Sequence, residues 1–241
     1  MHFNLPTPLN GWRDFAGEVG IIVVGVLIAL GAQQVVEDWQ GDSRARASIA
    51  AVDAELATNA GVFEERTLQQ PCEERRLSEM TALISAARTT RQLPRIAGIG
   101  KSVARPTQRG AWEEAQNSEV LERWPRQDRL TVATLYSQQL PSDTFTSGEA
   151  RQWLRLESMI RTMAGPVSYD DLALLADVVA DLTFYSWNNG IDAQQQFTAI
   201  TQRGIRPTYF VALDREGHRG EMQALVAKSP ICQRLSVSGG G

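Results

Sequence analysis

The sequence contains few residues of the types that carry chemistry: of 241 residues, only two are histidine (His2 and His218) and two are cysteine (Cys72 and Cys232). This scarcity argues against a His/Cys zinc site, and it leaves a cysteine nucleophile with one usable histidine as its base. The sequence also has no Ser-His-Asp order, no helical Glu-x-x-His pair and no glycine-rich nucleotide loop. We therefore predict no catalytic, cofactor-binding or metal-binding residues and no enzymatic activity.

The chain also lacks an excess of basic residues, since 24 Lys and Arg stand against 28 Asp and Glu, for a net charge of −4. Nucleic-acid-binding proteins usually carry a strongly basic face, so we expect no nucleic acid partner. Strand-type alternation of Val and Ile is almost absent, whereas the helix-favouring residues Ala, Leu, Arg, Glu and Gln are abundant. The expected fold class is all-α.

There is one long hydrophobic run, EVGIIVVGVLIALGAQQVVEDW at residues 18–39. About 20 helical residues cross the hydrocarbon core of a bilayer, and residues 15–36 reach that length if their polar members lie near the ends. Trp12 and Trp39, about 40 Å apart on a helix, flank the run as interface anchors. We predict a transmembrane anchor at 15–36, preceded by a cytoplasmic or interfacial segment at 1–14.

Two alternatives to an anchor remain open. Residues 19–30 have the length of a signal-peptide core, and Ala29-Leu30-Gly31 fits a cleavage site, which would leave a secreted soluble helical domain. A buried core helix is the other alternative. Against cleavage, the region before the run is weakly basic and the helical pattern continues past Gly31.

Helical phase places several residues of the anchor on one face. At about 100° per residue, Glu18, Gly25, Ala29 and Ala32 fall within one narrow sector. Gly25-x-x-x-Ala29 is a small-xxx-small pair, which lets another helix approach closely. We predict a helix-packing face covered by a membrane-protein partner or by a second copy of the chain. The alternative is that Gly and Ala are common in membrane helices and that Glu18 reaches the interface.

The flanks of the anchor indicate its orientation. Arg13 precedes it, whereas Glu37, Asp38 and Asp42 follow it, with Arg44 as the first basic residue on that side. The positive-inside rule then favours a cytoplasmic N-terminus and places the bulk of the chain on the other side of the membrane.

The string FAGEVGIIVVGVLIAL at residues 15–30, followed by Glu37-Asp38-Trp39, resembles the N-terminal signature of a bacterial family of membrane-anchored proteins of unknown function, the DUF6090 type. The stretch GAWEEA at residues 110–115 resembles a later part of such proteins. The resemblance implies an uncleaved anchor and implies no activity. We therefore expect a bacterial inner-membrane protein whose C-terminal domain is periplasmic.

Residues 37–235 are expected to form a multi-helix extracytoplasmic domain built from antiparallel helical hairpins. Apolar residues at three- and four-residue steps predict a helix over 42–69, a turn at Pro71 and a second helix with its stripe from Leu77 to Ala87.

Later helices are predicted at 111–124, 125–139, 146–164, from 168 to about 200, and at 220–228. Capping boxes at Thr146-x-x-Glu149 and Ser168-x-x-Asp171 open two of them, and a turn is predicted at Pro141. We also predict a kink at Asn188-Asn189-Gly190 and a flexible tail at 236–241. The predicted core aromatic residues are Trp112, Trp124, Trp153 and Trp187.

Residues 88–110 hold six basic residues, no acidic residue, two prolines and three glycines, a composition typical of a loop. Arg91, Arg95, Lys101 and Arg105 are candidates for contact with anionic lipid or with an acidic partner. The alternative is a solvated connection, because scattered basic residues are common in such segments.

Cys72 and Cys232 are predicted to form a disulfide in an oxidising periplasm, which would stabilise the domain by roughly 3–5 kcal/mol. Two unrelated buried thiols are the alternative. Asp177 and Asp181 share a helix face and could hold a metal with other oxygens, although a solvated face is the simpler interpretation.

These patterns predict a structural or accessory subunit, or a protein-interaction module, of a membrane complex, in contact with the lipid bilayer and without catalysis of its own. A membrane-tethered sensor or enzyme with a ligand pocket between helices is the alternative from another class.

Overall fold

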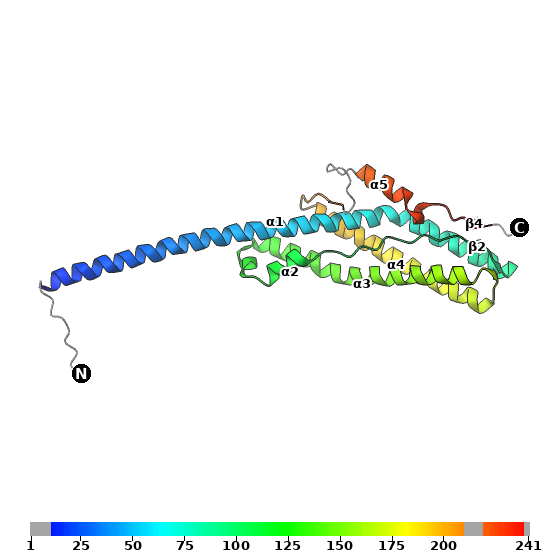
Figure 1. The fold of residues 1–241 in the computed structure, drawn as a ribbon, viewed down its shortest axis with the longest axis horizontal. Helices are drawn as coiled ribbons and strands as arrows, with labels where there is room; N and C mark the ends of the chain where they lie inside the picture. Colours follow the sequence, from blue (N-terminus) through cyan, green and yellow to red (C-terminus); the bar gives the residue numbers. More distant parts are fainter. Residues whose placement is uncertain (1–10, 210–218, 239–241) are drawn as a thin grey trace, which may run out of the picture.

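The computed structural model describes residues 11–209 and 219–238, and this part of the chain is mostly helical, as predicted (Figure 1). Its helices are α1 (Gly11–Thr90), α2 (Gly110–Gln116), α3 (Arg126–Thr162), α4 (Tyr169–Thr201) and α5 (Arg219–Lys228), with 3-10 helices η1 (Glu119–Arg123) and η2 (Pro230–Cys232). Four two-residue strands, β1 (Gln92–Leu93), β2 (Arg95–Ile96), β3 (Gly165–Pro166) and β4 (Val237–Ser238), form the antiparallel pairs β1–β3 and β2–β4.

The first helix, α1, is continuous over 80 residues, or about 120 Å. The turn predicted at Pro71 is wrong, since this proline lies inside α1. Pro71 is on the exposed side of the helix, so its ring interrupts backbone hydrogen bonding there without disturbing the packed face. The hairpin expected around it therefore does not form.

Three long helices, α1, α3 and α4, pack side by side into a bundle (Figure 1). α1 and α3 run in the same direction, whereas α4 runs back after the short connection at 163–168. We call the end of the bundle near Thr90 the distal end and the end nearest the apolar run the proximal end. The sequence predicted a succession of antiparallel hairpins. The connection from α1 to α3 is not a hairpin, because these two helices run parallel.

Two helix boundaries test the capping predictions. The box at Ser168 is confirmed, because its hydroxyl accepts from the backbone N–H of Asp171 at 3.0 Å and the Asp171 carboxylate accepts from the Ser168 N–H at 3.2 Å. The box at Thr146 and the turn at Pro141 are wrong, since α3 runs through both. Pro141 faces outward, as Pro71 does.

Core positions on the long helices repeat every seven residues, in alternating steps of three and four. On α4 the buried residues at these positions are Leu172, Leu175, Val179, Leu182, Ser186, Asn189, Ala193, Gln196 and Ile200. On α1 they are Ala45, Val52, Leu56, Asn59, Phe63, Glu73, Leu77, Met80, Ile84 and Ala87, with the half-buried Ile49, Arg66 and Gln70 in the same phase. A strict seven-residue repeat favours a left-handed supercoil, and here it holds only when polar residues are counted.

An extended segment, residues 97–109, returns from the distal end to the proximal end along the bundle and leads into α2 (Figure 1). We call it the return segment. Asn59 fixes it on α1, because its amide nitrogen donates to the Gln108 carbonyl at 2.8 Å and its amide oxygen accepts from the Gln108 N–H at 2.7 Å. This segment and the two short strands β1 and β2 occupy most of the predicted basic loop at 88–110.

The C-terminal part of the chain lies along α1. The Thr208 N–H donates to the Ala57 carbonyl at 2.8 Å, and a Cβ on Gly61 would stand 2.0 Å from the Thr208 carbonyl oxygen, so this crossing requires glycine. Beyond α5, Cys232 is bonded to Cys72, which confirms the predicted disulfide.

The flexible tail predicted at 236–241 is wrong for Val237 and Ser238, which pair with β2, and residues 239–241 lie outside the described residues. Three of the four predicted core tryptophans are buried: Trp112, Trp124 and Trp153. The prediction for Trp187 is wrong, because its side chain is 59% exposed.

Candidate functional site

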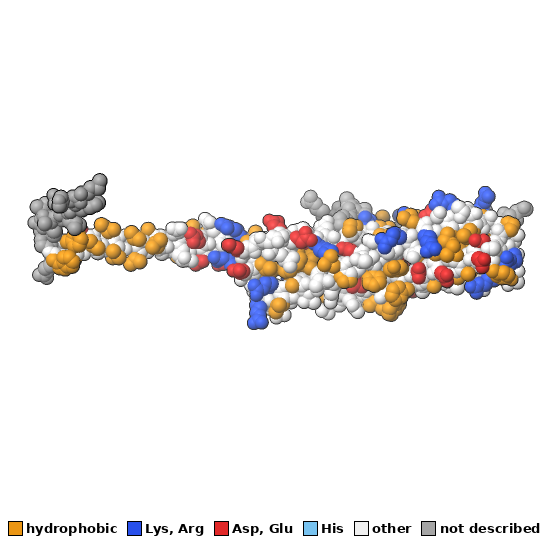
Figure 2. Space-filling model, turned by 90° about the horizontal axis from the view of Figure 1, so that it is seen from below, with side chains coloured by type: hydrophobic (Ala, Val, Ile, Leu, Met, Phe, Trp, Pro, Cys, Tyr) orange, Lys and Arg blue, Asp and Glu red, His pale blue; other side chains and the backbone are white. Residues whose placement is uncertain are grey.

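The apolar run forms the N-terminal part of α1, which extends away from the bundle (Figures 1 and 2). Every side chain from residue 15 to residue 40 is exposed, and a Cβ on Gly25 would meet no atom within 4 Å. By length and composition α1 can cross a membrane. The predicted packing face (Glu18, Gly25, Ala29 and Ala32) and the predicted interface anchors Trp12 and Trp39 therefore all lie on uncovered helix.

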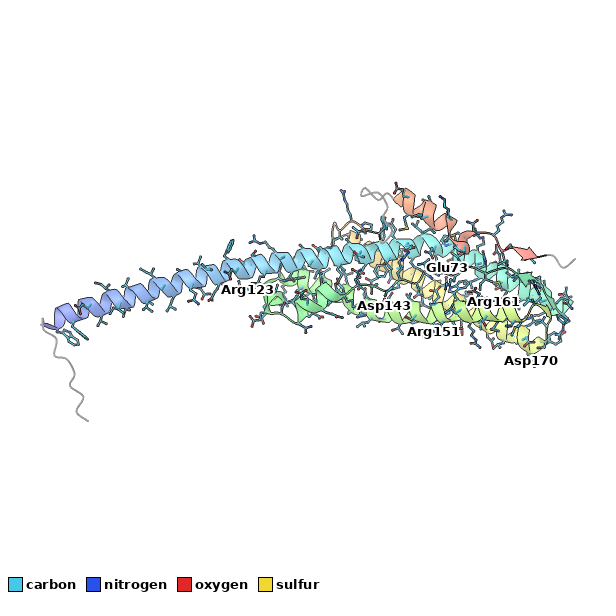
Figure 3. The ribbon with its side chains drawn as sticks, viewed as in Figure 1. Glu73, Arg123, Asp143, Arg151, Arg161 and Asp170 are labelled. Atoms are coloured by element: carbon cyan, nitrogen blue, oxygen red, sulfur yellow. A yellow bond between two sulfur atoms is a disulfide. The ribbon has the colours of Figure 1, made fainter. Side chains whose placement is uncertain are left out.

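The bundle begins directly after this run. Arg123 of η1 crosses Gly41 of α1 and contacts the carboxylates of Asp38 and Asp42, each at 3.3 Å (Figure 3). Arg123 thus joins the proximal end of the bundle to α1 within a few residues of Val36.

The four basic candidates do not form one surface. Arg91 and Arg95 lie at the distal end, about 80 Å along α1 from Val36, so they do not reach a bilayer crossed by residues 15–36. The Arg91 guanidinium stacks 3.7 Å from the centre of the Tyr169 ring. Arg105 donates to Glu65 at 2.6 Å, and Lys101 is exposed on the return segment.

A buried polar layer crosses the middle of the bundle, and Figure 3 labels its α1 member Glu73. Arg66 of α1 is at its centre: Nη1 donates to Glu73 Oε1 and to Ser102 Oγ, each at 2.6 Å, and Nη2 donates to Glu149 Oε1 at 3.1 Å. One guanidinium thus connects two carboxylates on different helices.

Neighbouring side chains complete the hydrogen bonds of both carboxylates. Trp153 Nε1 and Asn189 Nδ2 donate to Glu149 at 3.2 and 2.5 Å, and the Ser186 hydroxyl donates to Glu73 Oε2 at 2.8 Å. Because α1, α3, α4 and the return segment all contribute, the layer fixes the register of the helices against one another. We define the polar layer as Arg66, Glu73, Ser102, Glu149, Ser186 and Asn189.

The charge of the polar layer depends on pH. Two buried carboxylates face one guanidinium, which leaves one negative charge in excess if both are ionised. Burial raises the pKa of Glu73 from its usual 4.5 to about 7; Arg66 opposes this shift and Glu149 adds to it. A proton on Glu73 therefore neutralises the layer.

Glu73 is expected to make the bundle less stable as the pH rises. Between pH 4.5 and 7 the folded chain holds a proton on Glu73 that the unfolded chain has lost. The stabilisation is fully present below pH 4.5 and is lost as the pH rises through 7, a change of about 3 kcal/mol in the free energy of unfolding. Urea unfolding of the full chain in mild detergent between pH 4.5 and 8 measures it.

Glu73→Gln is the matched control for this prediction, because glutamine is neutral at every pH and nearly the same shape. The difference in stability between the variant and the wild type should move in favour of the variant as the pH rises through 7. A difference that stays constant over the range would show that Glu73 does not titrate as assigned.

A second buried polar group lies nearer the proximal end. Glu55 accepts from the backbone N–H groups of Ala111 and Trp112 at 2.8 and 3.3 Å and from the Tyr136 hydroxyl at 2.6 Å. A carboxylate at a helix N-terminus is favourable, so Glu55 fixes α2 on α1. Burial, and then the hydrogen bond to Glu55, raise the pKa of Tyr136, which stays protonated.

The cavity beside the polar layer is small. Its volume is about 30 Å³, and Arg66, Ser102, Glu149 and Trp153 are among the residues that line it. That volume holds about one water molecule, whereas ligand sites measure hundreds of Å³. Among the described residues no three His, Cys, Asp or Glu side chains are grouped to hold a metal ion. The arrangement holds the three long helices and the return segment together, and it offers neither a ligand pocket of ordinary size nor a metal site among the described residues.

The sequence analysis did not predict the polar layer, although two of its members follow a recognisable pattern. Arg66 and Glu73 lie in phase with Phe63 and Leu77 on α1 and are polar residues at core positions. Comparison of the chain with family models, curated proteins and solved structures found no match.

Proposed function

We propose that this chain is a single-pass inner-membrane protein of a bacterium, anchored by residues 15–36, with its N-terminus in the cytoplasm and its helical domain in the periplasm. In this proposal it acts as an accessory subunit or interaction module of a membrane complex and performs no chemistry itself. Its partner is another membrane protein or a second copy of the chain.

The observation that carries the proposal is the continuity of α1. One helix contains the uncovered apolar run and, without interruption, the core stripe of the bundle. The bundle then extends about 80 Å beyond Val36, which suits a part that positions a binding surface at a set height above the membrane. The disulfide between Cys72 and Cys232 fits an oxidising compartment.

Crosslinking in native membranes tests the proposal. The full chain is expected to stay in the membrane pellet after alkaline carbonate extraction and to form a crosslinked species larger than the monomer. Gly25→Ile should reduce that species several-fold, because a large side chain on the packing face keeps a neighbouring helix away. The yield is read on denaturing gels, and the partner is identified by mass spectrometry.

Val24→Ile, which adds only one methylene off the packing face, is the matched control and should leave the yield unchanged. Recovery of monomer alone, or equal crosslinking of Gly25→Ile and wild type, would reject the packing face. A mature N-terminus at Ala32 in the intact mass would replace the anchor by a cleaved signal peptide.

A further inference from the structure

Aromatic side chains gather on the outside of the bundle, near its middle. On α4, Phe184 is 56% and Trp187 is 59% exposed, and Phe145 of α3 lies with its ring centre 6.5 Å from that of Phe184. Figure 2 shows hydrophobic side chains protruding near the middle of the bundle. Large aromatic residues grouped on a surface are characteristic of protein interaction sites. We call Phe145, Phe184 and Trp187 the aromatic surface.

A groove of about 520 Å³ runs beside the aromatic surface, between α1 and α4. Its α1 wall extends from Gln70 to Ser85, which is about 23 Å or four helical turns. That wall carries the small side chains of Ser78 and Ala82, and Trp187 lies on the opposite wall. The groove therefore has the length and the shape to receive one face of another helix.

Helix α4, which forms one wall of the groove, carries a net negative charge. In its 33 residues α4 carries five aspartates and no lysine or arginine, and the groove contributes one more carboxylate, that of Glu74. Two of the aspartates, Asp177 and Asp181, lie exposed within three helical turns of Trp187. A second copy of the chain fits poorly here, because a two-fold contact through α4 would place these aspartates against their own counterparts.

We propose that the aromatic surface and the adjoining groove bind an amphipathic helix of a partner protein, with its apolar side chains against Trp187 and its Lys or Arg side chains beside the aspartates of α4. The proposal rests on the interaction function given above and adds a second contact surface, on the helical domain, through which that function is performed. It differs from the packing face of the anchor, which lies within the membrane segment.

The test uses an 18-residue helical peptide of leucine and lysine that carries one photoreactive side chain. It is irradiated with the full chain in nanodiscs of phosphatidylcholine, and the crosslinked sites are mapped by mass spectrometry. We expect crosslinks on α4 around Trp187 and on α1 between Gln70 and Ser85. Trp187→Ser should lower their yield at least tenfold, and a peptide of leucine and glutamate should give few.

Leu154→Ser is the matched control, because Leu154 is 53% exposed on α3 and should not affect the crosslinks. Both side chains are largely exposed, so both variants should melt at the wild-type temperature, which separates binding from folding. Equal yields for Trp187→Ser and wild type, or equal yields for the two peptides, would overturn the proposal. A negative result with the peptide would not change the crosslinked species expected in native membranes. The proposed function and the binding site proposed here are therefore tested separately.

Discussion

Replacing Cys72 and Cys232 together by serine is expected to lower the free energy of unfolding by about 5 kcal/mol. The bond joins residues 160 apart in the sequence, and closing a loop of that length removes much of the conformational entropy of the unfolded chain. The loss is comparable to the whole stability of many domains, so the variant should be partly unfolded at 37 °C. Urea unfolding of the full chain in mild detergent measures the change.

Other contacts keep the C-terminal segment near α1 in the folded variant. Arg75 and Arg76 donate to the backbone carbonyls of Cys232 and Gln233, and β4 pairs with β2. The folded structure should therefore change little while its stability drops. Wild type treated with a thiol reductant should match the double variant, and non-reducing gels report the bond. A change below about 1 kcal/mol would mean that the bond does not constrain the unfolded chain as the loop-entropy model requires.

Arg66→Met is expected to destabilise the bundle by about 3–5 kcal/mol, because it leaves the carboxylates of Glu73 and Glu149 buried without a cation. Methionine has nearly the volume and flexibility of the arginine stem, so the loss reports the missing charge more than a cavity. The measurement is urea unfolding at pH 8, where Glu73 would otherwise be ionised.

The control is Arg161→Met, which removes an exposed guanidinium paired with Glu157 one turn away (Figure 3). Such exposed pairs contribute under about 1 kcal/mol. Adding Glu73→Gln and Glu149→Gln to Arg66→Met should restore part of the stability, since the layer is then neutral. If Arg66→Met cost no more than Arg161→Met, the polar layer would not be a buried ion cluster.

The polar layer also explains which predictions failed. The sequence suggested two helices because Pro71 lies between two apolar stripes, and the polar residues Arg66 and Glu73 separate those stripes. Both residues occupy core positions of one unbroken seven-residue repeat, so the interruption is a change in core chemistry and not in secondary structure. Glu149 was assigned from the sequence to a capping box. In the structure it accepts a hydrogen bond from Arg66, which offsets the cost of burying that guanidinium.

Local patterns predicted other features correctly. The helical composition, the capping box at Ser168 and the pairing of Cys72 with Cys232 were all predicted from the sequence. The parallel course of α1 and α3 was not, because it depends on the return segment. That segment is held by contacts between distant residues, such as Asn59 with Gln108, which no local pattern displays.

In the proposed anchored state, the continuity of α1 transmits any tilt of residues 15–36 to the bundle. Transmembrane helices tilt by about 20° on average, and a tilt of that size moves a point 80 Å away sideways by about 27 Å. Arg123 ties the base of the bundle to α1 beside Val36, so the bundle follows the tilt. A partner that changes the tilt of the anchor by that amount would thereby move the distal end sideways by about the diameter of one small domain.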